Sequence, residues 1–306
     1  MKISGGLGNQ LFQYAAGVLL AAEGNLVLDI SNYSSPSNPR EFSLKRYELT
    51  GGYEILNWKK SFTRIKLENV ATRLSCAGNL SFLNRAIYNF CNPAVARILS
   101  YKEEESFQIS RNIGWDPYLF TRKSKNAKFL GYFQSYLFIP PEFSLRLNQD
   151  LITAKESKYL TQIARAAEKE SPLVVHIRFG DYVDNSVYEE LSLKYYKESI
   201  KYQMNTGLYR TIWLFSDDLH RAKTFVPIEF SGIVHTKEES NVDPTIILEA
   251  MRFGKGYVLA NSTFGWWGAW LSYSINPIVI APAKWFKSWK NPERLMPNEW
   301  ICFDNQ

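Results

Sequence analysis

Two polar residues, His176 and Arg178, interrupt an apolar run near the middle of the chain. The run follows Pro172, and the His-x-Arg alternation places the imidazole and the guanidinium on one face of an extended strand. Burying both groups is unfavourable unless an anion meets them. Because ligands bind at the carboxyl ends of strands in open α/β sheets, the pair predicts an anion-binding site. A strand end with an Arg–Asp ion pair and a hydrogen-bonded histidine is the alternative.

A second polar segment, Asn261-Ser262-Thr263, follows a predicted strand at residues 257–260 and opens a predicted helix. The N–H groups and the dipole of a helix amino terminus bind phosphate, and an arginine supplies a bidentate positive partner. Together with Arg178, this segment therefore predicts a diphosphate site. Helix capping without a ligand is the alternative for the segment alone.

A third polar segment, Ser216-Asp217-Asp218, follows a predicted strand at residues 211–215. Adjacent residues leaving a strand point to opposite faces, so joint chelation of a metal by the two carboxylates is poor geometry. We expect one aspartate to cap the next helix and the other to face the ligand. No metal site is predicted.

The amino-terminal part contains Gly6-x-Gly8 and then the amide pair Asn9-Gln10 at the start of a predicted helix. A glycine-rich turn between a strand and a helix suggests a dinucleotide site, but Leu11 stands where the third glycine of that motif belongs. A nicotinamide-dependent oxidoreductase is therefore a weak alternative. The amide pair faces the expected ligand crevice, or Asn9 simply caps the helix.

Composition narrows the class of protein. The chain has 306 residues, 45% of them hydrophobic and 15% aromatic, with a net charge of +6 and a pI near 9.0. The composition is that of a globular protein, and the positive net charge favours an anionic partner. Because the basic residues are dispersed along the chain, we expect no nucleic-acid binding. Three cysteines form no CxxC pair, and no segment is apolar enough to span a membrane. We expect a cytoplasmic protein.

The order of predicted elements indicates an α/β protein of two domains. Strands at 1–4 and 26–30 flank a helix at 11–22, and helical periodicity recurs at 80–100 and 144–170. From residue 173 onward strands and helices alternate, which is typical of a parallel sheet covered on both faces. We place the domains at 1–150 and 151–306.

Five motifs in order resemble those of the bacterial α-1,2-fucosyltransferases, which form glycosyltransferase family 11. They are GGLGNQLFQY at 5–14, GYFQS at 131–135, HxRxGDY at 176–182, FSDD at 215–218 and NSTFGWWGAWL at 261–271. The resemblance spans nearly the whole chain. It implies a GT-B fold, in which two Rossmann-like domains face a central cleft, with the donor bound by the second domain and the acceptor by the first.

The resemblance also implies a reaction. Family members transfer fucose from GDP-fucose to the 2-hydroxyl of a terminal galactose, with inversion and without a metal or other cofactor. The implied partners are GDP-fucose and a galactose-terminated oligosaccharide or lipid-linked glycan.

The candidate site residues come from the matched motifs, with Asp29 added from the end of the second strand and Glu249 from the helix at 244–253. The candidate catalytic residues are Arg178 at the diphosphate, His176 near the guanine, and Asp181, a possible base. The candidate donor-binding residues are Tyr182, Ser216, Asp217, Asp218, Glu249, Asn261, Ser262, Thr263 and Phe264. The candidate acceptor-side residues are Gly6, Gly8, Asn9, Gln10 and Asp29, of which Asp29 is the other possible base.

The chain departs from the family pattern at two places. Phe179 stands where relatives commonly have a second arginine, and the helix at 244–253 lacks early acidic residues. Asp243 or Glu249 is the predicted replacement for a guanine or ribose contact. Three alternatives are a GT-B transferase with another nucleotide-sugar donor, a non-catalytic glycan- or nucleotide-binding protein, and the oxidoreductase.

The carboxyl-terminal region contains a basic-aromatic segment at 284–290. We expect it either to pack back onto the first domain or to rest on a membrane surface, which would make the protein peripheral at the inner face of the membrane. No oligomeric state follows from the sequence.

Overall fold

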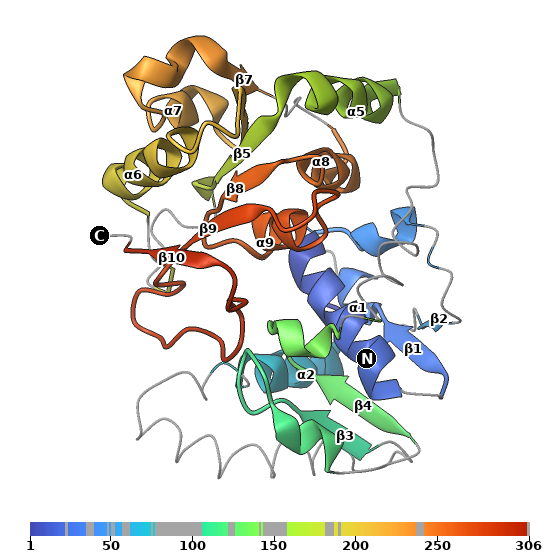
Figure 1. The fold of residues 1–306 in the computed structure, drawn as a ribbon. Helices are drawn as coiled ribbons and strands as arrows, with labels where there is room; N and C mark the ends of the chain where they lie inside the picture. Colours follow the sequence, from blue (N-terminus) through green and yellow to red (C-terminus); the bar gives the residue numbers. More distant parts are fainter. Residues whose placement is uncertain are drawn as a thin grey trace. The chain divides into compact units, whose positions relative to one another are not determined.

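A computed structural model of the chain forms two compact units, shown in Figure 1. The structure describes residues 1–21, 24–34, 40–47, 49, 53–56, 62–74, 76, 106–121, 126–140, 142, 158–180, 187–188, 191–236 and 242–304. Unit 1 comprises Met1–Ile152 and Trp289–Leu295, and unit 2 comprises Thr153–Ser288 and Met296–Gln306.

Unit 1 contains two helices and four strands among its described residues: α1 Leu7–Ala21, β1 Leu26–Asp29, β2 Tyr53–Leu56, α2 Phe62–Leu74, β3 Ser106–Ile109 and β4 Ala127–Leu130. The predicted strand at 26–30 and the helix expected at 11–22 are confirmed, although α1 begins four residues earlier. The helix predicted at 80–100 lies outside the described residues.

The amino-terminal segment joins the two strand pairs of unit 1. β1 pairs with β2 and β3 pairs with β4, all in parallel. Between them, the Lys2 N–H donates to Phe129 O at 3.0 Å and the Ile3 N–H donates to Asp29 O at 3.0 Å. The strand predicted at 1–4 is therefore present as a short bridging segment.

Residues 289–295 pack within unit 1 through backbone hydrogen bonds. The Trp115 N–H donates to Glu293 O at 3.0 Å, and the Tyr136 N–H donates to Arg294 O at 3.0 Å. A Cβ atom on Gly114 would lie 2.3 Å from the Glu293 nitrogen, so a glycine is needed for this close approach.

The described residues of unit 2 form five helices and six strands: α5 Lys158–Glu170, β5 Pro172–Ile177, α6 Leu193–Met204, β6 Thr211–Ser216, α7 Leu219–Lys223, β7 Val234–Thr236, α8 Pro244–Met251, β8 Gly256–Val258, α9 Thr263–Trp270, β9 Ile278–Pro282 and β10 Ile301–Phe303. The strands make one parallel sheet in the order β10-β9-β8-β5-β6-β7.

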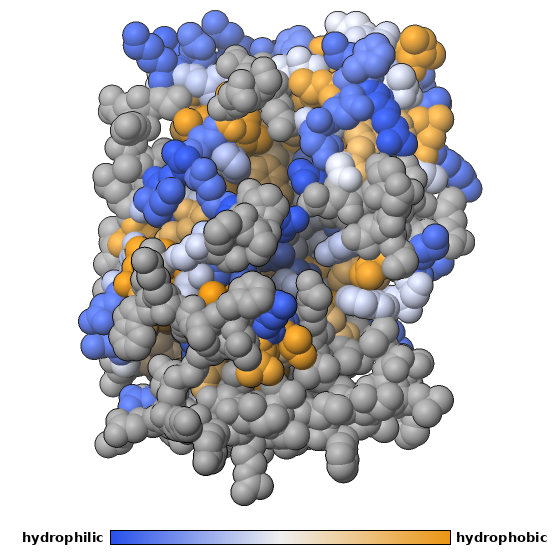
Figure 2. Space-filling model, turned by 180° about the vertical axis from the view of Figure 1, so that it is seen from behind, coloured by the Kyte–Doolittle hydropathy of each residue, from blue (hydrophilic) through white to orange (hydrophobic). Residues whose placement is uncertain are grey.

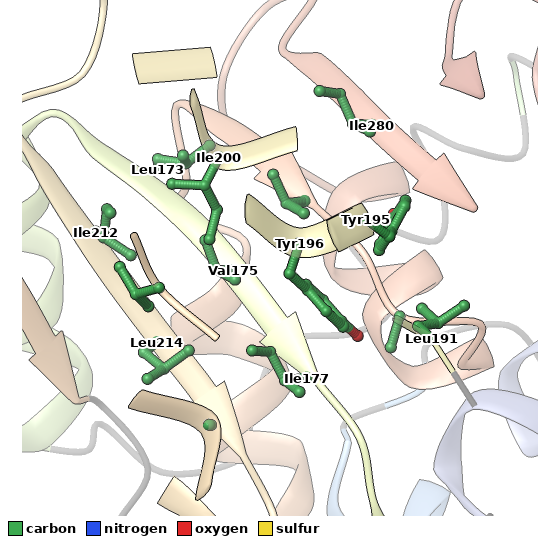
Figure 3. Packing of buried hydrophobic residues seen from close by; sticks show 14 of the residues in the cluster. Leu173, Val175, Ile177, Leu191, Tyr195, Tyr196, Ile200, Ile212, Leu214 and Ile280 are labelled. Atoms are coloured by element: carbon green, nitrogen blue, oxygen red, sulfur yellow. The ribbon is translucent and has the colours of Figure 1, made fainter. Parts of the chain in front are cut away.

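Helices cover both faces of this sheet, and every residue of β5 is therefore buried. On one face, Leu173, Val175 and Ile177 of β5 pack with α6, as Figure 3 shows for Tyr196 and Ile200. The other face packs against α5, α8 and α9. The α/β class and the wholly parallel, doubly covered sheet predicted from the sequence, as in a GT-B fold, are confirmed.

On the face seen in Figure 2, hydrophilic and hydrophobic residues are mixed among the described parts of the surface. Among the residues that the structure describes, no helix is both long enough and apolar enough to span a membrane.

Candidate functional site

The sheet of unit 2 reverses its strand order between β5 and β8. From β5 the chain adds β6 and β7 on one side, and then returns to add β8, β9 and β10 on the other. In open α/β sheets this switch point leaves a crevice at the carboxyl ends of the two central strands, where ligands bind. The motif residues that follow β5 and β8 therefore flank the expected ligand position.

Arg178 is the first residue after β5, and its side chain is 35% exposed. Its Nε atom lies 3.3 Å from Oδ2 of Asp217, which follows β6, the strand next to β5. The Arg–Asp ion pair considered from the sequence is present. Unlike His176, the Arg178 guanidinium is partly open to solvent.

Asp217 also binds the backbone of the turn after β5. Its Oδ1 accepts from the Phe179 N–H at 3.0 Å, and its Oδ2 accepts from the Gly180 N–H at 2.8 Å. Burial raises the pKa of Asp217, but these two hydrogen bonds and the charge of Arg178 outweigh burial and lower the pKa below its usual value. Asp217 is therefore an anion at neutral pH.

The neighbours of Asp217 cap the next helix. Asp218 is the N-cap of α7 and accepts from the Arg221 N–H at 2.9 Å, while the Ser216 hydroxyl accepts from the Asp218 N–H at 3.1 Å. One aspartate of the pair therefore caps a helix and the other does not, as expected for adjacent residues leaving a strand. Among the described residues, no cluster of three or more His, Cys, Asp or Glu could hold a metal ion.

The α9 helix begins at Thr263, after a four-residue connection, residues 259–262, from the end of β8. The Ser262 hydroxyl caps it by accepting from the Phe264 N–H, and the Asn261 side-chain amide donates to Trp285 O at 3.0 Å. Asn261 is buried and holds the segment in place, whereas Thr263 and Phe264 are half-buried. The first turn of α9 thus presents backbone N–H groups at the switch point.

His176 connects the β5 and α9 sides of the site. It is 4% exposed, and its Nδ1 atom has no hydrogen-bond partner in the described part of the chain. A Cβ atom on Gly265 would lie 2.4 Å from Nδ1, so the imidazole is packed directly against the first turn of α9. Burial, followed by the nearby Arg178 charge, lowers the pKa of His176 to about 4, and the Asp217 charge opposes this only partly. The imidazole is neutral at pH 7.

This neutral histidine makes the protein less stable in acid. The unfolded chain takes up the proton near pH 6.5, whereas the native state resists it down to about pH 4. Stability present above pH 6.5 is therefore lost as the pH falls towards 4, by roughly 3 kcal/mol. We expect denaturant unfolding at a series of pH values to show this slope in the wild type and to lose it in His176→Gln. Parallel pH profiles for the two proteins would contradict the assignment.

Phe179 lies in the core. Its side chain is buried on the α6 and α7 face, 5.3 Å from the Phe225 ring centroid and beneath the Arg221 guanidinium at 4.1 Å. The position where relatives commonly have a second arginine is thus used for packing in this chain. Asp181 and Tyr182, which complete this motif, lie outside the described residues.

Glu249 belongs to a buried cluster around the end of α8. Both of its oxygens lie 2.8 Å from Nη1 of Arg252, and Tyr273 donates to Oε2 at 3.1 Å. Asp243 caps α8 by accepting from the Thr245 N–H at 2.9 Å. Asp243 and Glu249, which were predicted to make a guanine or ribose contact, therefore both have structural partners within unit 2.

Buried side chains of unit 1 hold its glycine-rich loop in place by hydrogen bonds. Gly5 adopts a φ of 81°, and its carbonyl accepts from the Gln10 amide at 3.0 Å and from the Tyr33 hydroxyl at 2.8 Å. The side-chain oxygen of Gln10, Oε1, accepts from the Ser43 N–H at 2.9 Å. The fully buried Gln10 amide thus shapes the loop that carries the half-buried Gly6 and the buried Gly8.

Asn9 is half-buried at the same helix start and accepts from the Gln134 amide at 2.9 Å. Gln134 is buried, and its own Oε1 has no hydrogen-bond partner among the described residues. Gln134 belongs to the GYFQS motif at 131–135, and its residue type assigns it no role. Residue type alone does not show that the two amides, 125 positions apart, form a pair.

Asp29 ends β1 in a buried ionic cluster. Its carboxylate pairs with Lys128 of β4, which also lies 3.0 Å from Glu68 of α2, and Glu68 is 3.3 Å from Lys2. The Asp29 carboxylate also accepts from the Ser31 N–H at 3.1 Å. Asp29 is therefore bound to cationic and backbone partners inside unit 1.

Comparison with known proteins gives a family match and relatives of similar length. Residues 119–304 match the model of glycosyl transferase family 11. An "Alpha-1,2-colitosyltransferase" of Escherichia coli is 30% identical over 98% of this chain and 97% of its own. The "O-antigen biosynthesis glycosyltransferase WbnK" of Escherichia coli is 29% identical over 98% of both chains.

Solved structures show more distant similarity. The fucosyltransferase NodZ from Bradyrhizobium is 12% identical, with 89% of this chain and 91% of that chain covered and a TM-score of 0.46. The ADP-heptose LPS heptosyltransferase II of E. coli is 12% identical, with coverage of 99% and 89% and a TM-score of 0.49.

Proposed function

Because this chain belongs to glycosyl transferase family 11, we propose that it transfers fucose from GDP-fucose to the 2-hydroxyl of a terminal galactose. The transfer inverts the anomeric carbon and needs no metal ion. The acceptor is an oligosaccharide, either free or linked to a lipid.

The observation that carries this proposal is the composition of the switch point. Arg178 leaves β5, the capped first turn of α9 follows β8, and the two strands are hydrogen-bonded neighbours. A guanidinium and a helix amino terminus are the two protein groups that best bind a diphosphate. The contact between His176 and the first turn of α9 keeps the two sides of the site in register.

The same groups suit the bond changes of the reaction. The acceptor oxygen bonds to C1 of the sugar while the bond from C1 to the β-phosphate oxygen breaks and GDP leaves with the electron pair. Negative charge grows on the β-phosphate, where Arg178 and the α9 N–H groups stabilise it, while the sugar ring passes through a cationic state. The hydroxyl proton needs an acceptor. We propose Asp181 for this role, since Asp29 would first have to leave its ion pair with Lys128.

A second donor is supported by one of the relatives. That relative is named a colitosyltransferase, and colitose is the 3-deoxy form of fucose. The diphosphate site described above binds the part that such donors share, so it does not distinguish them. GDP-colitose is therefore the alternative donor, with the same linkage chemistry.

The test is an assay of GDP release in EDTA with lactose or a galactosyl-N-acetylhexosamine as acceptor, using GDP-fucose and GDP-colitose in parallel. We expect acceptor-dependent release from GDP-fucose, and NMR of the product should show an α-1,2 linkage to galactose. Faster release from GDP-colitose would identify GDP-colitose as the donor and leave the proposed type of reaction unchanged. Tight GDP binding without release from either donor would indicate a non-catalytic binding protein.

A further inference from the structure

We propose that Asp217 is a positioning residue: it holds Arg178 and the turn at 178–180 in the conformation that receives the donor diphosphate. The inference rests on the proposed function, in which Arg178 binds that diphosphate. It assigns Asp217 a role through the protein itself, in place of the direct donor contact expected from the sequence.

Three donors from one short turn converge on the Asp217 carboxylate. The Phe179 N–H reaches Oδ1 at 3.0 Å, and the Gly180 N–H and the Arg178 Nε reach Oδ2 at 2.8 and 3.3 Å. Only a carboxylate accepts at both oxygens, because the amide of an asparagine would point N–H groups at one of these donors. The turn and the guanidinium stem are thus tied to the end of the neighbouring strand β6.

Gly180 fits the same arrangement from the other side. A Cβ atom there would lie 2.7 Å from Asp217 Oδ2, which is closer than real Cβ contacts. The obstructing atom is the end of a side chain, so an alanine would displace the carboxylate without forcing the backbone apart. The absence of a side chain at 180 is therefore a requirement of the Asp217 contact.

Glu229 supplies a control. It is an exposed acidic residue of the same unit, and its carboxylate pairs with Lys201 at 2.9 Å. If Asp217 acts by holding the turn after β5, neutralising Asp217 will affect donor use and neutralising Glu229 will not.

The experiment is a double-mutant cycle between Asp217→Asn and Arg178→Lys, a substitution that keeps the positive charge and removes Nε. We expect Asp217→Asn alone to lower kcat/KM for the donor by about tenfold to a hundredfold, with the acceptor KM unchanged. In the Arg178→Lys background the same change should cost no more than about twofold, because the guanidinium that Asp217 positions is absent. Glu229→Gln should keep wild-type donor kinetics, and Gly180→Ala should reproduce the donor defect of Asp217→Asn while the melting temperature stays close to wild type.

Equal effects of Asp217→Asn in both backgrounds would overturn the proposal and return Asp217 to the role of a direct donor ligand. A defect in Asp217→Asn that is matched by a fall in melting temperature, without a defect in Gly180→Ala, would reduce Asp217 to a stability role. Failure of the proposed function would give a different result: Arg178→Ala, which removes the charge, would be fully active and would bind GDP as the wild type does.

Discussion

Replacing Arg178 with alanine should lower kcat/KM by about a thousandfold while the melting temperature changes little. The loss is large because the leaving diphosphate gains charge in the transition state and would then keep only the helix-terminus N–H groups. The fold should survive, since the Arg178 side chain is 35% exposed and Asp217 retains its hydrogen bonds to the turn. Steady-state kinetics with GDP-fucose and a galactoside, together with thermal unfolding, measure both quantities.

The control for this variant is Arg210→Ala. Arg210 is an exposed arginine immediately before β6, at the opposite end of the same sheet from Arg178. The Arg210→Ala substitution removes the same charge from unit 2 and should leave turnover unchanged. Near-normal turnover of Arg178→Ala, or an equal loss in Arg210→Ala, would mean that the charge at the carboxyl end of β5 does not bind the donor.

Glu68→Ala should lower the free energy of unfolding of unit 1 by about 3–5 kcal/mol. Glu68 is fully buried and lies within 3.3 Å of Lys2 and 3.0 Å of Lys128, so its removal takes a carboxylate away from two buried cations. Burial of an incompletely paired charge costs much more than loss of an exposed ion pair.

Hydrogen exchange of the β1 and β4 amides under native conditions, combined with urea unfolding, would measure this loss within unit 1. Glu54→Ala is the control, because Glu54 is an exposed residue of β2 in the same unit. A change below about 1 kcal/mol in Glu68→Ala would show that water already screens this cluster, as it does at exposed sites.

Sequence patterns predicted the strands and helices of unit 2 that position the candidate site. β5 and β6 are apolar runs ended by polar motifs, and the Asp243-Pro244 pair is typical of the start of a helix such as α8. Strands β2 and β3 were not predicted, because four residues such as Ser-Phe-Gln-Ile show too little periodicity. The segment from Phe129 onward indicates a strand leading into an aromatic turn, whereas β4 begins two residues earlier. Lys128 obscured this start, since a buried lysine resembles an exposed strand position until its two carboxylate partners are known.

The candidate site was predictable in its residues and less so in their partners. Spacing placed His176 and Arg178 on one face of a strand, but the packing of His176 against Gly265 joins residues 89 positions apart. Gln10 shows the same difficulty, because an amide beside a glycine-rich loop suits a ligand and a backbone carbonyl equally well. The partner of a polar side chain is set by tertiary packing, which no local pattern contains.

Titration calorimetry of the wild-type protein with GDP and with GMP tests the diphosphate site most directly. If Arg178 and the first turn of α9 bind the β-phosphate, GDP should bind at least about tenfold more tightly than GMP. That preference should become markedly smaller in Arg178→Ala and persist in Arg210→Ala. Equal affinities of GDP and GMP for the wild type would contradict a diphosphate site at the β5–β8 switch point.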